Sequence, residues 1–504
     1  MKAAPAPSTT YNPPQPLDGV IPLEFLLATP AKVVCSAIFL SGRDWEEVKG
    51  SSLVHALVSH HMHDVLVDLV DVAIDEESAS VTVSFTPTED RVDALVGGYR
   101  AFYENWSSFE ADYDAERARI LAAGTVSRTA RFVNDSLGSV ILPLPGRAPE
   151  EPQYTPATIE TSLPPAETQA WPMGDVVEGK PDALSAKFGD AVQLAFADPA
   201  AHTAGVVVLH RGRIVAEQYR PGVDHTMQLE SWSMGKSLTA TLIGVLVQQG
   251  HLTLEQPAPV PEWQTPGDPR QKITIRDLLQ MSSGLNFRGQ PRPRQEWTLG
   301  VPDHLYFYSD VVDAFRYSVS APLEFEPGTL GRYLNCDPLT LGYIVKMTVE
   351  GLGEDYLTWP QRALFDQIGI RRQVLETDWY GQFLLTGFDY GTPRNWARIG
   401  QLHLQDGVWD GRRILPEGWS DFVSTPAPGW DQAQYGGQWW INTPGEFRVP
   451  GNTYMCGGFG EQRTFVVPQH DLVVVRMGHL ADTSAARDTL NDMLEAIMGA
   501  VEAA

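Results

Sequence analysis

The chain has 504 residues, 43% of them hydrophobic and 20% charged, which is the composition of a globular protein with two or three structural units. Its formal net charge of −26 repels nucleic acid and anionic lipid surfaces, so we expect no nucleic-acid partner. No apolar run approaches the ~18 residues of a transmembrane helix, which argues against a membrane span.

Cysteine and histidine are too sparse to predict a metal site. The three cysteines, Cys35, Cys336 and Cys456, lie far apart and form neither a disulfide framework nor a CxxC zinc motif. The densest histidine group, "SHHMH" at residues 59–63, has no carboxylate close enough to complete a metal motif and is typical of a solvated loop. We therefore expect no metal and no cofactor.

The first part of the chain divides into a leader and an accessory region. Residues 1–19 are rich in proline and alanine and lack the apolar segment of a signal peptide. We expect a flexible leader, on a chain that is cytoplasmic as given or exported after removal of a signal. Residues 20–145 predict an accessory α+β region. In it, "KVVCSAIFLSGRD" (32–44) predicts a strand and a turn, "ASVTVSFTP" (79–87) alternates as a half-buried strand, and "DRVDALVGGYRAFYENW" (90–106) has helical spacing.

A linker separates this region from the main domain. Residues 146–172 are rich in proline and glutamate and predict an extended linker or a surface strap. Residues 173–504 begin with a predicted β-hairpin, "AGVVVLHRGRIVAEQY", whose apolar runs flank Arg211 and Gly212. A helix-rich insertion over residues 252–386 follows, and the chain then returns to strands with "YGGQWWINT", "EQRTFVVPQ" and "DLVVVRMG" before a last helix. This order predicts one antiparallel sheet assembled from both ends of the domain, with a helical insertion between them.

The most apolar predicted helix, "SMGKSLTATLIGVLVQQG", begins with Ser233 and Lys236. Positions i and i+3 share one face of a helix, with Cβ atoms about 5–6 Å apart, so the two side chains can touch. Serine needs a base to act as a nucleophile, and a buried lysine with a lowered pKa can be that base. The helix N-terminus favours an oxyanion on the attacked carbonyl, and Gly235 is expected to leave space for a substrate. The alternative, an N-cap serine followed by a surface lysine, is weakened because this is the only Ser-x-x-Lys in the chain.

About a hundred residues later, Tyr333 and Asn335 follow a Pro-Gly turn in "PGTLGRYLN" and precede another apolar helix. A tyrosine held beside Lys236 would lose its proton more easily and could act as a general base. The Tyr-x-Asn pattern is weak by itself, because "YEN" at residues 103–105 repeats it inside a predicted helix.

Taken together, these motifs resemble those of the β-lactamase-related serine hydrolases, which include class C β-lactamases, D-Ala-D-Ala peptidases, β-lactamase-like carboxylesterases and nylon-oligomer hydrolases. The resemblance covers most of residues 175–478 and rests on six segments in the family's order: "SMGKS", "ITIRDLLQMSSGL", "PGTLGRYLN", "TPRNWARIGQLHLQDGVWDGRRILPEGW", "YGGQWWIN" and "GGFGEQRTFVVPQHDLVVVRMG". It implies an α/β (α+β) fold of the β-lactamase/transpeptidase type, an antiparallel sheet flanked by helices with a helical subdomain, here with an N-terminal extension. It also implies that Ser233 is the acylated nucleophile, that Lys236 and Tyr333 are its base pair, and that Asn335 positions Lys236 and the substrate.

The third motif of this family, a cationic residue followed by Thr or Ser and then Gly, falls at Cys456-Gly457-Gly458, where the cation is missing. Gly458 suits a strand that approaches a ligand closely. The resemblance implies that the backbone N–H of Phe459 is the second oxyanion donor, beside that of Ser233. The missing cation argues against β-lactams as physiological substrates, and we interpret Cys456 as a small packing residue.

The segment around Cys35 is similar to an N-terminal extension of longer family members, which often carry a second cysteine near the end of that region. The comparable position here is Ser139, so no disulfide is expected there. The predicted strands of this region are few and its apolar runs are short. We therefore expect it to fold against the hydrolase domain and not as a freely tethered module.

The sequence thus predicts an enzyme, a serine hydrolase that cleaves a small-molecule ester, amide or short peptide substrate through an acyl-enzyme on Ser233. We expect Trp439 and Trp440 to line the substrate pocket with Tyr306 and Phe307, although core packing explains these aromatic residues equally well. The alternatives are an acyltransferase, a penicillin-recognising D-Ala-D-Ala peptidase, and a catalytically silent binding protein of the same fold.

Overall fold

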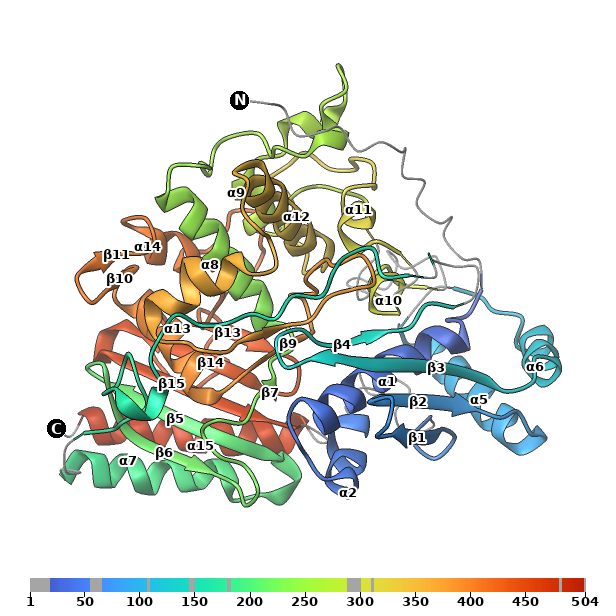
Figure 1. The fold of residues 1–504 in the computed structure, drawn as a ribbon, viewed down its shortest axis with the longest axis horizontal. Coiled ribbons are helices and arrows are strands. Elements are labelled where there is room, and N and C mark those ends of the chain that lie inside the picture. Colours follow the sequence, from blue (N-terminus) through green and yellow to red (C-terminus); the bar gives the residue numbers. More distant parts are fainter. Residues whose placement is uncertain are drawn as a thin grey trace.

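The computed structural model describes residues 19–54, 66–106, 109–144, 149, 151–178, 183–287, 301–309, 312–479 and 483–502. The predicted leader, except for Gly19, and the "SHHMH" group lie outside these ranges. In Figure 1 a main body (residues 183–502) occupies the larger part of the molecule, and an N-terminal block (residues 19–144) packs beside it. A strap (residues 151–178) connects the two.

The main body is built on a six-stranded antiparallel sheet. Its strands, in spatial order, are β12 (Trp440–Ile441), β13 (Tyr454–Gly458), β14 (Gln462–Val467), β15 (Leu472–Gly478), β5 (Thr203–His210) and β6 (Arg213–Tyr219). β15 pairs with β5, with Val474 opposite Val208, and this pairing joins the two ends of the domain in one sheet as predicted. β5 and β6 form the predicted hairpin, and Arg211 and Gly212 at its turn both have positive φ. The predicted strand "YGGQWWINT" is reduced to the two residues of β12.

Helices cover both faces of this sheet (Figure 1). α7 (Ala183–Gln193) and α15 (Thr483–Glu502) pack together over one face, and α13 (Pro393–Leu404) lies on the other. α8 (Met234–Gln248) packs against β13, and its residues from Met234 to Leu246 are all buried. A helical subdomain adds α9 (Ile275–Leu279), α10 (His304–Tyr308), α11 (Ala314–Ser318) and α12 (Cys336–Gly351). A small hairpin, β10 (Val408–Trp409) and β11 (Arg412–Arg413), and the helix α14 (Trp419–Ser424) follow α13.

The N-terminal block contains a four-stranded antiparallel sheet and helices packed around it. The strands, in order, are β1 (Asp71–Asp75), β2 (Ser80–Phe85), β3 (Val126–Asn134) and β4 (Gly138–Ile141). The helices are α1 (Leu23–Phe39), α2 (Trp45–Val48), α5 (Glu89–Trp106) and α6 (Tyr113–Ala122). β2 and α5 confirm the predicted strand and helix.

The strand predicted at residues 32–44 is wrong, because most of this segment belongs to α1. α1 packs on β2, β3 and β4 and also contacts α10 of the main body. It is buried on nearly all sides, so it shows neither the alternation of a strand nor the polar stripe of a surface helix. A short apolar run of this kind does not distinguish helix from strand by periodicity.

A separate three-stranded sheet lies beside the start of α8. Its order is β7 (Leu229–Glu230), β9 (Asp389–Gly391) and β8 (Val374–Leu375), all antiparallel. β7 leads directly into Ser233 and α8. This small sheet therefore holds the backbone that enters the candidate nucleophile's turn.

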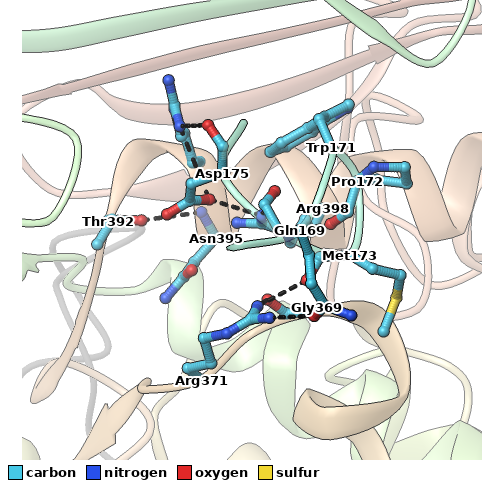
Figure 2. A network of polar contacts seen from close by, with 12 residues as sticks. Gln169, Trp171, Pro172, Met173, Asp175, Gly369, Arg371, Thr392, Asn395 and Arg398 are labelled. Carbon is cyan, nitrogen blue, oxygen red and sulfur yellow. Dashed lines mark hydrogen bonds and ion pairs between the residues drawn. The ribbon is translucent and has the colours of Figure 1, made fainter. Parts of the chain in front are cut away.

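The strap runs across the surface of the main body and is held there by arginine side chains (Figure 2). Arg371 donates hydrogen bonds to the backbone carbonyl oxygens of Pro164 at 2.7 Å and Met173 at 2.6 Å. Arg398, from α13, pairs with Asp175 at 2.7 Å, and its guanidinium stacks on the ring of Trp171 at 4.4 Å. These contacts bind the connection to the main body over its C-terminal part.

The N-terminal block and the main body share one hydrophobic core. One cluster of buried side chains includes Phe25 and Val81 from the block together with Trp232 and Leu238 from the main body. Among the described ranges, the structure contains no helix with the length and hydropathy of a transmembrane span.

Candidate active site

Ser233 occupies the sharp turn between β7 and α8. The preceding residue, Trp232, has a φ of +51°, in the left-handed region that residues other than glycine rarely adopt. Ser233 is the N-cap of α8 and is half-buried, whereas the helix after it is buried. A strained turn that presents a serine at a helix N-terminus is a common device of functional sites.

Lys236 lies one turn further along α8 and contacts Ser233 directly, as the spacing predicts. Its Nζ atom is 2.7 Å from Ser233 Oγ and donates a hydrogen bond to the backbone carbonyl of Thr386 at 3.1 Å. The side chain is only 1% exposed. Burial lowers the pKa of Lys236 to about 7, although the negative charge of Asp389 raises it. A large fraction of this amine is therefore neutral at neutral pH and can accept a proton.

Tyr333 comes from the segment before α12 and lies on the same site. Its ring centroid is 4.8 Å from Lys236 Nζ. Burial raises the pKa of Tyr333 to about 12, although a hydrogen bond with Ser233 and the charge of Arg463 lower it. We expected the opposite direction from the neighbouring lysine. Burial outweighs the groups that lower this pKa, so Tyr333 keeps its proton at neutral pH.

Two further expectations for the residues around α8 are revised. Asn335 is the N-cap of α12. Within the described ranges, Lys236 makes its side-chain hydrogen bonds to Ser233 and to the carbonyl of Thr386, not to Asn335. Gly235 does not open space for a substrate. A Cβ atom there would lie 2.5 Å from Asp389 Oδ1 and 2.6 Å from the carbonyl of Leu385. This glycine therefore lets α8 pack closely against the segment 385–389.

The glycine-rich end of β13 packs against the turn that carries Ser233. A Cβ atom on Gly458 would lie 2.2 Å from the carbonyl oxygen of Ser231, so only glycine fits this close approach. The next residue, Phe459, packs its ring edge-on against Trp232 at 6.0 Å. Cys456 is fully buried, and burial raises the pKa of its thiol, as expected for a packing residue.

The four aromatic residues expected in the pocket wall separate into two groups. Trp440 stacks near Tyr333, with ring centroids 5.0 Å apart, and so belongs to the site. Trp439 is fully buried against His403 and Tyr454, which makes it a core residue. Tyr306 and Phe307 are likewise at most 1% exposed, and Tyr306 packs on Phe25 of the N-terminal block. Trp439, Tyr306 and Phe307 are therefore buried in the core, which is the alternative that the sequence left open for these residues.

Two features of the site, the carbonyl of Thr386 and the side chain of Asp389, were not predicted. The carbonyl of Thr386 accepts hydrogen bonds from Lys236 and also from the hydroxyl of Tyr308, at 2.8 Å. Asp389, fully buried beside Gly235, completes the surroundings of the lysine. Burial raises the pKa of Asp389 to about 8, although Ser231, Gln373 and Lys236 lower it. A backbone carbonyl has no signature in the sequence, and "GFDYG" does not distinguish a buried aspartate from a loop residue.

The arrangement combines a half-exposed hydroxyl, a buried amine of low pKa and a protonated phenol around one turn. Such a set can transfer an acyl group to the serine without a metal ion. The described residues contain no group of three or more His, Cys, Asp or Glu side chains that could hold a metal.

Comparison with known proteins places this chain in a family. The sequence profile of the β-lactamase family matches residues 188–496. A 6-aminohexanoate-dimer hydrolase from Paenarthrobacter ureafaciens is 25% identical over 300 residues, which cover 56% of this chain and 73% of that enzyme. A solved structure assigned as a 6-aminohexanoate-dimer hydrolase from Bacillus anthracis has the same fold, with a TM-score of 0.51 and 21% identity, over 64% of this chain and 89% of that one. The chain belongs to the β-lactamase family, whose members are hydrolases, and it has the β-lactamase/transpeptidase-like fold.

Proposed function

We propose that this protein is a serine hydrolase that cleaves the amide or ester bond of a small substrate through an acyl-enzyme on Ser233. The observation that carries the proposal is the 2.7 Å contact between Ser233 Oγ and the buried Nζ of Lys236, whose pKa is lowered to about 7. A solvated lysine at this position would stay charged and could not take the serine proton.

In the first half of the reaction, Ser233 Oγ attacks the carbonyl carbon of the substrate while its proton moves to the neutral amine of Lys236. The carbonyl electron pair moves to oxygen and forms a tetrahedral oxyanion. When this intermediate collapses, the C–N or C–O bond breaks. The leaving amine or alcohol takes a proton from the hydroxyl of Tyr333, which regains one from the ammonium of Lys236.

In the second half, water replaces the leaving group. Lys236 accepts a proton from the water as it attacks the acyl ester, and the collapse of the second tetrahedral intermediate returns a proton to Ser233 Oγ. The carboxylic acid is released. The proposed oxyanion donors are the backbone N–H groups of Ser233 and Phe459, because the contact between Trp232 and Phe459 brings these two segments together.

The substrate class follows from the charge at the third motif. Where the family has a cationic side chain, this chain has the neutral and buried Cys456. Arg463, which lies opposite Gly457 on the neighbouring strand, donates to the carbonyl of Gly458 at 2.8 Å and pairs with Glu461 at 3.1 Å. Its charge is thus partly compensated, by a carboxylate that also pairs with Arg487. These features favour substrates without a carboxylate at this position, and the similarity to a 6-aminohexanoate-dimer hydrolase supports a linear amide over a β-lactam.

A fluorophosphonate probe tests the nucleophile, and a substrate panel tests the reaction. The probe should add one adduct, on the peptide that carries Ser233, and Ser233→Ala should remove both the adduct and the hydrolysis. The panel consists of p-nitrophenyl esters, p-nitroanilides, short linear amides and nitrocefin. Labelling that survives in Ser233→Ala would disprove the assignment, and an unreactive wild-type protein would favour a silent binding protein.

A further inference from the structure

The three-stranded sheet connects the two segments that surround Lys236. β7 leads into Ser233, and the chain between β8 and β9 carries Thr386 and reaches Asp389. β9 is the central strand, with Tyr390 opposite Glu230 and Asp389 opposite Leu375. A displacement of either outer strand would therefore move atoms that contact the lysine or the serine.

Each outer strand ends at a buried carboxylate. Glu230 is the last residue of β7 and is 3% exposed, and Glu376, which follows β8 directly, is fully buried. A buried carboxylate without a partner is strongly unfavourable, so the sheet depends on whatever neutralises these two side chains.

The partner of Glu376 comes from the N-terminal block. Lys32, on α1, is 1% exposed and pairs with Glu376 at 3.2 Å. Ser36, one turn further along α1, donates a hydrogen bond to Glu376 Oε1 at 2.5 Å. The backbone N–H of Ser139 donates to the same oxygen at 2.7 Å. The carboxylate is thus held mainly by residues of the block.

The block also binds Glu230. Arg43 pairs with Glu230 at 3.3 Å, and the hydroxyl of Ser52 donates to it at 2.6 Å. His479, from the main body, lies 2.7 Å from the same carboxylate. Arg43 itself is also paired with Glu47 of the block, at 2.7 Å, which fixes its guanidinium.

Contacts continue from these ion pairs to the candidate active site. The backbone N–H of Glu376 donates to the carbonyl of Phe388 at 3.1 Å, and Lys32 Nζ lies 5.2 Å from the centroid of the Phe388 ring. The following residue, Asp389, packs against Gly235, next to Lys236. The charged groups that act on Asp389 are Lys236 on α8 and Glu376 beyond β8, and the neutral Ser231 and Gln373 complete its surroundings.

We propose that Lys32 and Arg43 are positioning residues of the hydrolase, which hold the three-stranded sheet in register around Ser233 and Lys236 by binding Glu376 and Glu230. The inference rests on the function proposed above. It gives the N-terminal block a role in catalysis although none of its residues touches the substrate in this mechanism.

The test replaces each ion pair as a unit in the full-length chain, in Lys32→Met/Glu376→Gln and Arg43→Met/Glu230→Gln. Removing both charges of a buried pair together leaves no unpaired charge. We expect each variant to lose about tenfold or more in kcat, with KM for the best ester or amide within about twofold of wild type. Fluorophosphonate labelling of Ser233 should slow by a similar factor.

The pH profile separates positioning from general destabilisation. In Lys32→Met/Glu376→Gln the two opposite charges of the pair are lost together. The acid limb of kcat/KM should therefore shift only if Asp389 moves relative to Lys236, because the charge of Asp389 acts on the pKa of Lys236. Asp366→Asn is the matched control. Asp366 accepts hydrogen bonds from Thr161 and Ser162 of the strap, so its loss weakens another inter-segment contact without touching the small sheet.

Wild-type kcat and an unchanged pH profile in both double variants would overturn the proposal, even if their melting temperatures fall. An effect in one variant alone would restrict the role to that pair.

If the double variants are insoluble, Ser36→Ala and Ser52→Ala replace them, and we expect each to lower kcat about threefold at unchanged KM. Wild-type kcat in both would overturn the proposal. A wild-type protein that neither labels nor hydrolyses would overturn the proposed function and this inference with it, whereas equal reactivity of wild type and variants counts against the inference alone.

Discussion

Lys236 and Thr386 are joined by a hydrogen bond of 3.1 Å from the side-chain nitrogen to the backbone carbonyl oxygen. The same nitrogen lies 2.7 Å from Ser233 Oγ. A lysine side chain in solution samples many rotamers, but here the carbonyl and the buried helix restrict it to one position beside the serine. The geometry that permits proton transfer is therefore present before a substrate binds.

Lys236 and Tyr333 should behave as one unit. We expect Lys236→Ala and Tyr333→Phe each to lower kcat by about three orders of magnitude or more, because the proton from Ser233 loses its path to the leaving group. The double variant should be hardly slower than either single variant. Steady-state kinetics with circular dichroism as a folding control measures this. Losses that multiply in the double variant would mean that the two residues act independently.

The activity should rise with pH through the pKa of Lys236. In the proposed mechanism the neutral amine of Lys236 is the active form, and its pKa is about 7, so kcat/KM should fall on the acid side of about pH 7. Tyr333, with a pKa of about 12, stays protonated on the alkaline side and should cause no loss up to about pH 10. A pH profile over this range checks both limbs. An acid limb near the ordinary lysine pKa would show that Lys236 is charged at neutral pH and is not the base.

Gly458 should tolerate no side chain. In Gly458→Ala the added Cβ atom would overlap the carbonyl oxygen of Ser231, at 2.2 Å, and push β13 away from the turn that carries Ser233. We expect a loss of about tenfold or more in kcat and a lower melting temperature. Gly499→Ala is the control, because a Cβ atom on Gly499, in α15, meets no atom within 4 Å. Equal kinetics of the two variants would contradict the close approach of β13.

Nitrocefin should be hydrolysed feebly compared with the best ester or amide. Cys456 is neutral and cannot hold the carboxylate of a cephalosporin, and Arg463, on the neighbouring strand, is engaged by Glu461 at 3.1 Å. The comparison requires kcat/KM for nitrocefin and for the panel of esters and amides under the same conditions. Equal values would refute the prediction and would indicate that Arg463 leaves Glu461 to bind the substrate.

Part of the fold could be predicted from periodicity, where an element has one buried and one exposed side. The strand β2 alternates and the helix α5 repeats at helical spacing. The hairpin of β5 and β6 was predicted from the two apolar runs that flank its turn, and β5 itself is buried along almost its whole length. α1 could not be predicted, since it is enclosed on nearly all sides and its apolar residues follow neither period. Whether this segment forms a helix or a strand therefore depends on its packing against the rest of the structure, including the main body.

The candidate site, too, could be predicted only where its contacts depend on local spacing along the chain. The contact between Ser233 and Lys236 follows from the spacing within one helix. The direction of the pKa shift of Tyr333 does not follow from local spacing, because the burial of this side chain depends on segments far apart in the chain. Likewise, Trp439 and Trp440 are adjacent in the sequence, yet alternation places one in the core and the other beside Tyr333.

The N-terminal block and the main body should unfold together. Phe25 packs on Tyr306, and Lys32 and Arg43 neutralise Glu376 and Glu230 across the boundary. We therefore expect one cooperative transition in calorimetry of the full-length chain. Deletion of the residues before Trp171 would expose the apolar surface under α1 and remove the cations that bind Glu376 and Glu230.

The fragment 171–504 should consequently be lost as soluble protein or lose its activity. Expression yield, the melting temperature and kcat on the best substrate measure these outcomes. Asp366→Asn in the full-length chain serves as the comparison, because it removes a strap contact while the block stays in place. A fragment that expresses well, melts at the full-length temperature and turns over the same substrate would show that the block is dispensable. Such a fragment would also contradict the positioning role of Lys32 and Arg43, since both side chains would be gone while the rate remained.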